Sequence, residues 1–237
     1  MKTFNINKFL ASNKKIIIKK EFLRLDRLEF LKKLIHEKKR LRVIEFGTGI
    51  STLVIAKCLQ LNKIKYGNIV KKFREKNFIC HTIDNNKKFL NYTKKNILTL
   101  GLTKFCKINF VDLIMQNYSG YIVSGCNYLP NINPDLILLD GPDQSLIKGS
   151  CQNINFSNTS FTPIQVDILK MEPYLIPGTI ILIDGRTNNA LFLKKKLYRK
   201  WKYKYFKKID QHLFELADPV LGNYNKSVLK FYNSKTK

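Results

Sequence analysis

Four aspartates each follow a run of apolar residues, and they are the first candidates for chemistry in this chain: Asp84, Asp112, Asp140 and Asp184. Carboxylates accept hydrogen bonds from hydroxyl groups, take up protons and coordinate divalent cations. The chain has 17 acidic residues against 43 Lys+Arg, so an acid repeated at the end of apolar runs is informative. If these runs are parallel strands, their carboxyl ends meet at one edge of a sheet, and the four acids belong to one site.

A glycine turn lies beside a fifth acid. Residues 42–57 read RVIEFGTGISTLVIAK, which predicts a strand, a tight turn at Gly47 and Gly49, and then a helix. Glycine lets the backbone turn sharply and lets a ligand approach it closely. The unpaired N–H groups in the first turn of the helix, around Ser51 and Thr52, point toward such a ligand. The pattern is typical of a nucleotide-type pocket, with Glu45 two residues before the first glycine.

Alternating strands and helices are expected to position these residues. Short apolar runs predict strands at 41–46, 78–83, 106–111, 134–140 and 179–184. Helical spacing of apolar residues predicts helices at 21–34, 51–60, 86–100, 162–174 and 186–200. We expect an irregular surface excursion at 61–77, a small hairpin at 118–125, and closing strands at 201–209, 211–217 and 227–232. The alternation is typical of an α/β protein whose mainly parallel sheet is covered on both faces.

Two residues bear on which nucleotide the turn binds. A dinucleotide-binding turn usually reads GxGxxG, whereas Thr52 stands at the place of the third glycine. Glu45 puts a negative charge at a place where it would not stabilise a pyrophosphate, which is itself negative. The same charge would attract an ammonium or sulfonium group. Both features disfavour an NAD-type oxidoreductase.

The run 45–52 resembles the first motif of class I S-adenosylmethionine-dependent methyltransferases, and 134–142 and 175–184 resemble the fourth and fifth strand motifs of that family. The resemblance covers roughly 41–232, although the acid at 84 lies farther from the glycine turn than the usual ~20 residues. It implies a Rossmann-like three-layer αβα sandwich with a mostly parallel sheet, an antiparallel C-terminal strand and a methyltransferase domain at 41–237. The apolar stripe at 21–34 predicts an N-terminal helical extension at 1–40 that caps this sheet. The resemblance also implies that S-adenosyl-L-methionine is bound by Glu45, Gly47, Thr48, Gly49, Ser51, Thr52, Asp84, Asp112 and Asp140.

Methyl transfer to a hydroxyl requires that the hydroxyl lose its proton, and Asp140 and Asp184 are the expected catalytic residues. Some O-methyltransferases that the chain resembles hold a divalent cation on acids of the fourth and fifth strands followed by an asparagine. Gly185 stands where that asparagine is expected, so a metal at Asp140 and Asp184 is kept as an alternative. The residues expected on the substrate side are Asp143, Gln144 and Arg186, with Asp167 reaching either the cleft or only its own helix turn.

The expected acceptor is a hydroxyl of a small molecule or a saccharide. Asp140-Gly-Pro-Asp143 differs from the Asn/Asp-Pro-Pro-aromatic motif of base-methylating members of the family. The net charge of +26 leaves an alternative, a basic nucleic-acid-binding protein or RNA methyltransferase on the same scaffold, although lysines spread along the chain also fit compositional bias. The five cysteines include no CxxC pair, and no apolar run reaches the roughly 18 to 20 residues of a membrane span. We therefore expect a cytoplasmic protein; its oligomeric state is left open.

Overall fold

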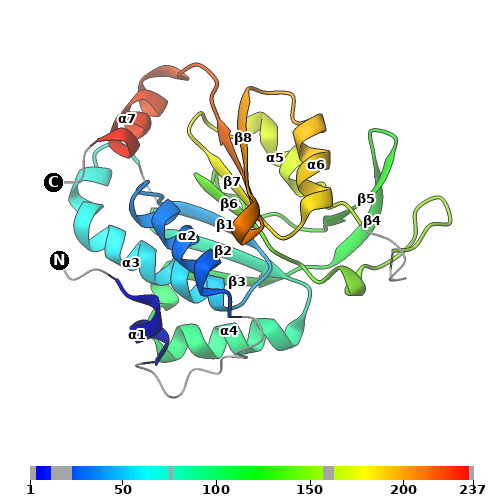
Figure 1. Ribbon diagram of the computed structural model, residues 1–237, viewed down its shortest axis with the longest axis horizontal. Helices are drawn as coiled ribbons and strands as arrows, with labels where there is room; N and C mark the ends of the chain where they lie inside the picture. The colour runs from blue at the N-terminus through cyan, green and yellow to red at the C-terminus, as the bar shows by residue number, and fades with distance from the viewer. Residues whose placement is uncertain (1–3, 12–22, 75–76, 157–162, 235–237) are drawn as a thin grey trace.

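A seven-stranded sheet is the centre of the computed structural model, which describes residues 4–11, 23–74, 77–156 and 163–234. Its order is β3-β2-β1-β6-β7-β9-β8 (Figure 1). Strands β1, β2, β3, β6 and β7 are parallel, whereas β9 runs antiparallel to both of its neighbours. The strands span Arg42–Phe46 (β1), Ile79–Asp84 (β2), Cys106–Phe110 (β3), Leu136–Leu139 (β6), Ile180–Asp184 (β7), Trp201–Phe206 (β8) and Gln211–Leu216 (β9).

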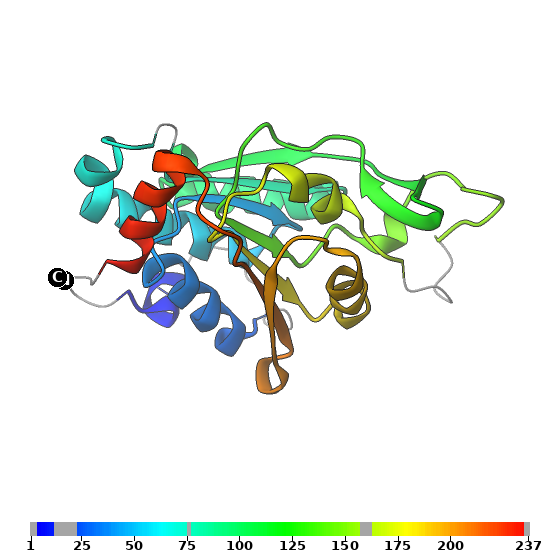
Figure 2. The ribbon, with the colours of Figure 1, turned by 90° about the horizontal axis from the view of Figure 1, so that it is seen from above.

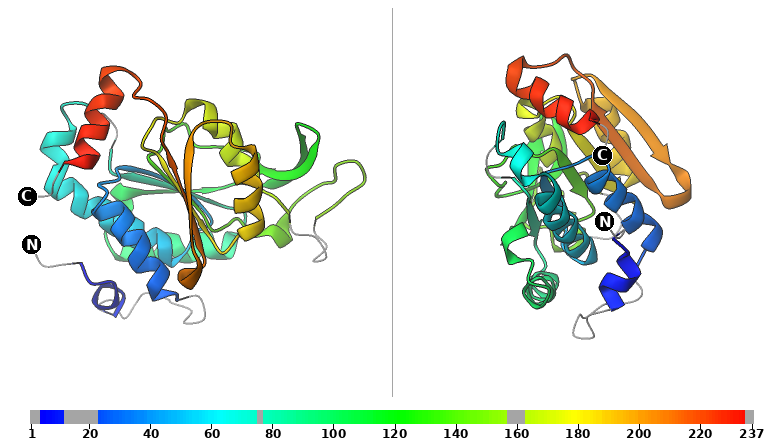
Figure 3. Two further views of the ribbon diagram at one scale, coloured as in Figure 1. Left: turned by 45° about the horizontal axis from the view of Figure 1, so that its top comes forward. Right: turned by 90° about the vertical axis from the view of Figure 1, so that its left-hand side faces the viewer.

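Two hydrophobic clusters, one on each face of the sheet, make the protein a three-layer structure. One cluster joins the sheet to α1 (Ile6–Ala11), α2 (Leu25–His36), α3 (Ile50–Val70), α4 (Lys87–Thr99) and α7 (Gly222–Asn233). The other joins it to α5 (Asp167–Met171), α6 (Thr187–Lys196) and a separate hairpin of β4 (Leu113–Tyr118) and β5 (Tyr121–Cys126). The hairpin extends from the body at the end away from α7 (Figure 2), and the β8–β9 ribbon forms one sheet edge (Figure 3). Short 3-10 turns lie at Thr103–Phe105 (η2), Gln144–Leu146 (η3), Glu172–Tyr174 (η4) and Lys207–Ile209 (η5).

Alternation along β1 explains why a charged residue can stand inside the sheet. Successive side chains of a strand point to opposite faces. Val43 packs in the cluster under α3, whereas Ile44 and Phe46 pack in the opposite one. Glu45 therefore points to the α3 side, toward the polar first turn of that helix.

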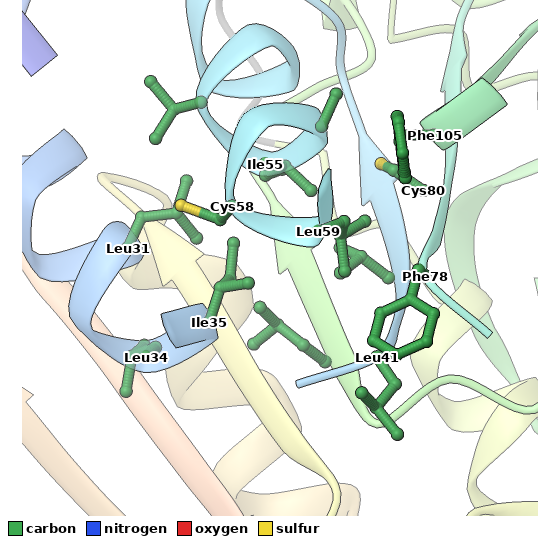
Figure 4. Close-up of a cluster of buried hydrophobic side chains, with 14 of the residues drawn as sticks. Leu31, Leu34, Ile35, Leu41, Ile55, Cys58, Leu59, Phe78, Cys80 and Phe105 are labelled. Carbon is green, nitrogen blue, oxygen red and sulfur yellow. The ribbon is translucent and has the colours of Figure 1, made fainter. Parts of the chain in front are cut away.

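Helix α2 packs closely on α3. Figure 4 shows Leu31 and Ile35 of α2 facing Ile55, Cys58 and Leu59 of α3. All five side chains are at most 2% exposed, so α2 shares one core with α3 and the sheet.

A buried ion pair anchors α7 at the end of the sheet opposite the carboxyl ends of the parallel strands. The Asp135 carboxylate, directly before β6, accepts from Arg74 Nη1 at 2.8 Å and from the Tyr232 hydroxyl at 2.7 Å. Arg74 Nη1 also donates to that hydroxyl at 2.8 Å, and both charged side chains are fully buried. Burial is tolerated here because each charge has a partner and further hydrogen bonds.

Three sequence-based element predictions were wrong. Residues 61–70, within the expected excursion, continue α3, because Asn62, Tyr66 and Val70 are buried at intervals of one helical turn between the lysines. The stretch 227–232 lies in helix α7, where Val228 and Phe231 face the core with helical spacing, and is not a strand. The helix expected at 162–174 is limited to α5, followed by η4, and its proposed start at 162 lies outside the described residues. Within the described segments no helix is long and apolar enough to cross a bilayer.

Candidate active site

A cavity of about 530 Å³ lies at the carboxyl ends of the parallel strands. The chain winds from β1 toward β3 in one direction and from β6 toward β7 in the other, so the gap between β1 and β6 is a topological switch point. Ligands of open α/β sheets bind at such points. The lining comes from the ends of β2 and β7, from the loops after β1, β6 and β7, from the start of α3, from α4, and from α2 with the residue before it: Arg24, Arg27, Leu28, Gly47, Thr48, Gly49, Ile50, Ser51, Asp84, Phe89, Tyr92, Thr93, Asn96, Asp140, Gly141, Pro142, Asp143, Asp184 and Arg186.

Gly47 and Gly141 let two of these loops touch. Gly47 has a φ of +96°, and a Cβ on it would lie 2.6 Å from the Gly141 nitrogen. A Cβ on Gly141 would meet the Gly47 backbone in turn, so neither position accepts a side chain without moving a loop. Gly49 differs, because a Cβ there would meet no protein atom within 4 Å. Its open side is the lining of the cavity, where a ligand can approach the backbone.

Glu45 holds the glycine turn from beneath and does not line the cavity. Its side chain is fully buried and accepts from Ser51 Oγ at 2.6 Å and from Thr52 Oγ1 at 2.7 Å. Thr52 Oγ1 also accepts from the Gly49 nitrogen at 3.0 Å. Burial raises the pKa of Glu45 to about 7, against the effect of these hydrogen bonds. Thr52, which stands in place of a third glycine, therefore links the acid to the turn.

Asp84 closes β2 and faces the cavity beside the turn. One carboxylate oxygen accepts from the Thr48 nitrogen at 2.9 Å and the other from the Asn86 nitrogen at 2.8 Å. Burial raises the pKa of Asp84, and these hydrogen bonds oppose the shift. Each oxygen of a carboxylate has a second lone pair. Asp84 is therefore oriented by the backbone and can still accept two hydrogen bonds from a ligand.

Asp140 directly follows β6, Asp184 ends the neighbouring strand β7, and both line the cavity. Asp140 is open to the cavity, and within the described part of the chain its carboxylate has no hydrogen-bond or ion-pair partner. Surrounding protein raises its pKa, and Arg186 and Arg27 oppose that rise. Burial, together with the charge of Asp140, raises the pKa of Asp184 to about 7 against the attraction of Arg27. Of the two acids, Asp140 is the one available to a bound molecule.

The loop after β6 carries two of the three residues expected on the substrate side, and Arg186 supports it. Arg186 donates from Nε to the Asp140 carbonyl at 3.1 Å and from Nη2 to the Pro142 carbonyl at 2.7 Å. Asp143 lines the cavity, and its carboxylate accepts from Ser145. Gln144 does not line the cavity; its Nε2 donates to the Pro163 carbonyl at 2.9 Å.

Two other predicted acids have structural partners in place of a ligand. Asp112 does not line the cavity, and its carboxylate lies 2.7 Å from Lys148 Nζ. Asp167 is fully buried and accepts from the Cys126 nitrogen at 3.0 Å and from Gln165 Nε2 at 2.8 Å. The structure therefore leaves Asp84, Asp140 and Asp184 in the cavity, but not Asp112.

The helices bring lining residues that the strand-based prediction missed. From α4 come Phe89, Tyr92 and Asn96, and from α2 comes Arg27. Tyr92 and Asn96 are four positions apart in a predicted helix, and that polar and aromatic spacing is a signal for a shared face. Nothing in the sequence around Arg27 distinguishes it from the many other cations of the chain.

The donor set does not suit a divalent cation. Across the described segments, no group of three or more His, Cys, Asp or Glu side chains is placed to hold a metal ion. Arg27 Nη1 already donates to Asp184 Oδ1, and position 185 is a glycine with no ligand atom in its side chain. The alternative of a metal on Asp140 and Asp184 therefore disagrees with the residues present.

Solved structures share this fold. Cofactor-bound Rv0187 from MTB matches with a TM-score of 0.51 at 13% identity over 90% of each chain. A methyltransferase from Geobacter sulfurreducens matches with a TM-score of 0.50 at 11% identity, over 89% of this chain and 87% of that one. The SAH-bound methyltransferase PaMTH1 from Podospora anserina matches with a TM-score of 0.50 at 10% identity, over 84% and 81%. No protein-family model and no curated protein matches the chain. The structural likeness establishes the Rossmann-like methyltransferase fold that the sequence predicted.

Proposed function

We propose that this protein transfers a methyl group from S-adenosylmethionine to a hydroxyl group. One observation carries the proposal: a glycine turn, a ligand-facing carboxylate at Asp84 and the Asp140 carboxylate, which has no partner among the described residues, open on a single cavity at the switch point of the sheet. The likeness to methyltransferase structures, one of them bound to SAH, supports the same activity.

The residues present fit the methyl donor. The cavity volume lies within the range of pockets that hold drug-sized ligands. Gly49 leaves open space at the start of α3, where unpaired backbone N–H groups favour a carboxylate. Asp84 would accept hydrogen bonds from the two ribose hydroxyls. Glu45 would act through the turn, since its oxygens already bind Ser51 and Thr52.

Asp140 is the proposed base. When bound, S-adenosylmethionine supplies a methyl group on a cationic sulfur, which is a good leaving group. A hydroxyl acceptor forms the new O–CH₃ bond and gives up its proton, and Asp140 is the open carboxylate that would take it. The raised pKa of Asp140 makes this carboxylate a stronger proton acceptor than an aspartate side chain free in water. Alignment of donor and acceptor by the cavity walls supplies much of the rate.

For the acceptor, we propose a hydroxyl of a small molecule or a saccharide. Asp143, Tyr92 and Asn96 offer polar groups in the cavity lining, and Arg186 adds a cation that suits an anionic substituent. Polar groups of this kind recognise hydroxylated ligands through hydrogen bonds.

Calorimetric titration with S-adenosylmethionine and with SAH tests the cofactor site. We expect Asp84→Asn to weaken binding by about tenfold or more, because charge-assisted hydrogen bonds to hydroxyls are lost. Asp112→Asn is the matched control, since that acid lies outside the cavity, and it is expected to bind like the wild type. Absence of binding by the folded wild type, or equal losses in the two variants, would refute the proposed site.

A transfer assay with labelled methyl groups tests the acceptor. One set of candidate acceptors consists of hydroxylated small molecules and saccharides, and the other is RNA. RNA is included because the net charge of +26 makes a nucleic acid the alternative partner. Binding to RNA that falls steeply with salt, in a protein that does not bind S-adenosylmethionine, would favour a non-catalytic nucleic-acid-binding protein.

A further inference from the structure

Arg27 brings a positive charge into the cavity from outside the sheet. It lies in the first turn of α2, and its Nη1 donates to Oδ1 of Asp184, 157 positions later in the chain. Its Nη2 lies 3.5 Å from Oδ2 of Asp210, directly before β9. The side chains of Arg27 and Asp184 are only 17% and 16% exposed. Their attraction is therefore screened less by salt than that of a surface pair.

Packing on two sides holds α2, and with it the backbone of Arg27. Leu28 and Leu31 are buried in the cluster that includes α3. On the other side, the ring of Phe30 lies 4.6 Å from that of Phe206, at the end of β8. The helix is fixed between α3 and the sheet edge, and the Arg27 side chain lines the cavity.

Gly185 lies directly beside the guanidinium, and a Cβ there would be in van der Waals contact with it. Its φ is +64°, and a Cβ on it would lie 3.4 Å from Arg27 Nη1 and 3.5 Å from Asp210 Oδ2. The asparagine that metal-dependent enzymes resembling this chain carry at this place would compete for that space. This chain therefore has Gly185 in place of the asparagine ligand of those metal-dependent enzymes, and the Arg27 guanidinium in place of their metal ion.

The charge of Arg27 acts on both acids of the cavity. Asp140 and Asp184 repel each other, and this repulsion adds to burial in raising the pKa of Asp184. Arg27 lowers the pKa of each of them. A guanidinium stays protonated at every pH at which the protein is folded. It therefore supplies a permanent positive charge that contacts Asp184 and acts on Asp140 from the same cavity, as a bound cation would.

We propose that Arg27 is the resident cation of this site: a positioning residue that orients Asp184 and takes the place of a divalent metal beside Asp140. The inference rests on the proposed function. In it, Asp184 is the ion-pair partner of Arg27, and Asp140 remains open to receive the proton of the acceptor hydroxyl. If Arg27 has this role, methyl transfer does not depend on added metal, and α2 is part of the active site.

Metal binding measured without turnover tests this assignment. The full-length wild type, Arg27→Lys, Arg27→Met and the double variant Arg27→Met/Gly185→Asn are titrated with Mn²⁺ and followed by electron paramagnetic resonance. We expect no saturable Mn²⁺ site in the wild type or in Arg27→Lys. The double variant should gain one, because Asp184 is freed beside the already open Asp140 and an amide oxygen is added, and asparagine tolerates the left-handed backbone at 185. Arg199→Met, which breaks another part-buried pair, with Asp218 at 2.6 Å, is the control that gains no site.

The pH profile of methyl transfer separates an electrostatic role from a merely structural one. Arg27→Met should move the rise in rate toward higher pH by about one unit, because the carboxylates lose the charge that lowers their pKa. Arg27→Lys should restore much of the wild-type profile.

A wild-type Mn²⁺ site that Asp184→Asn abolishes would overturn the proposal. A double variant that keeps the wild-type circular dichroism spectrum yet binds no Mn²⁺ would also overturn it, as would an Arg27→Met profile lowered equally at every pH. If the wild type binds no S-adenosylmethionine, the proposed function fails, while the Mn²⁺ titrations still decide whether Arg27 excludes a metal.

Discussion

Replacing Glu45 with glutamine is expected to change how the stability of the protein depends on pH. Glu45 is fully buried in β1, and burial raises its pKa from 4.5 to about 7. An acid with a raised pKa binds its proton more tightly in the folded than in the unfolded chain, so stability falls as the pH rises from 4.5 to 7. Glutamine keeps the size of the side chain, retains one acceptor oxygen where Glu45 offers one each to Ser51 and Thr52, and does not titrate.

The size of this change in unfolding free energy follows from the shift in the pKa of Glu45. It corresponds to about 3 kcal/mol over the whole titration, and to about 2–3 kcal/mol between pH 5 and pH 8. The unfolding free energy of Glu45→Gln, minus that of the wild type, should rise by this amount from pH 5 to pH 8. Urea denaturation followed by circular dichroism measures it, and the subtraction removes groups that titrate alike in both proteins.

Glu37→Gln, at an exposed position, controls for the loss of one acidic side chain. If the Glu45→Gln difference is the same at pH 5 and pH 8, or if Glu37→Gln gives an equal rise, Glu45 is not an acid buried beneath the turn and the reasoning fails.

Four further predictions concern the site and its support. Gly49→Ala places a methyl group where no protein atom lies within 4 Å, so calorimetry should show about tenfold weaker S-adenosylmethionine binding at an unchanged melting temperature. Gly141→Ala, whose methyl group meets Gly47, should instead lower the unfolding free energy by about 1–3 kcal/mol; equal melting temperatures would contradict the contact. Asp140→Asn should lower kcat by about 100-fold or more. The rate of the wild type should rise with pH and level off once Asp140, whose pKa is raised, is deprotonated. A rate that does not change with pH would show that Asp140 is not the base. Tyr232→Phe removes a hydroxyl bonded to Asp135 and Arg74, and urea denaturation should show a loss of about 1–3 kcal/mol with unchanged cofactor affinity.

The parts of the site that follow from strand periodicity could be predicted from the sequence. Asp84, Asp140 and Asp184 meet in one cavity because parallel strands end at the same sheet edge. Gly47 could be assigned to a turn because a strand pattern changes there to a helix pattern. The reason that Gly141 must also be a glycine is invisible in the sequence, since it is the contact between two loops.

The parts that depend on distant partners could not be predicted. Asp112 lies just beyond the end of β3 much as Asp84 lies at the end of β2, yet Lys148 from a later loop lies against Asp112 and the cavity does not reach it. Arg27 faces Asp184 only because α2 packs on α3 and the end of β8. A local pattern describes neither contact, because each joins elements far apart in the chain.

The cavity lining has four carboxylates and three arginines, although the chain as a whole is strongly basic. The protein carries a net charge of +26, yet its cavity contains three strand-end carboxylates whose pKa values are raised by burial, Asp84, Asp140 and Asp184. A cation bound nearby stabilises their ionised forms and is attracted in return. Under the proposed function, the methyl donor carries such a charge on sulfur and loses it on transfer. The same carboxylates that favour binding of the donor therefore hold the neutral product less tightly, so the acids at the strand ends favour both entry of the donor and release of the product.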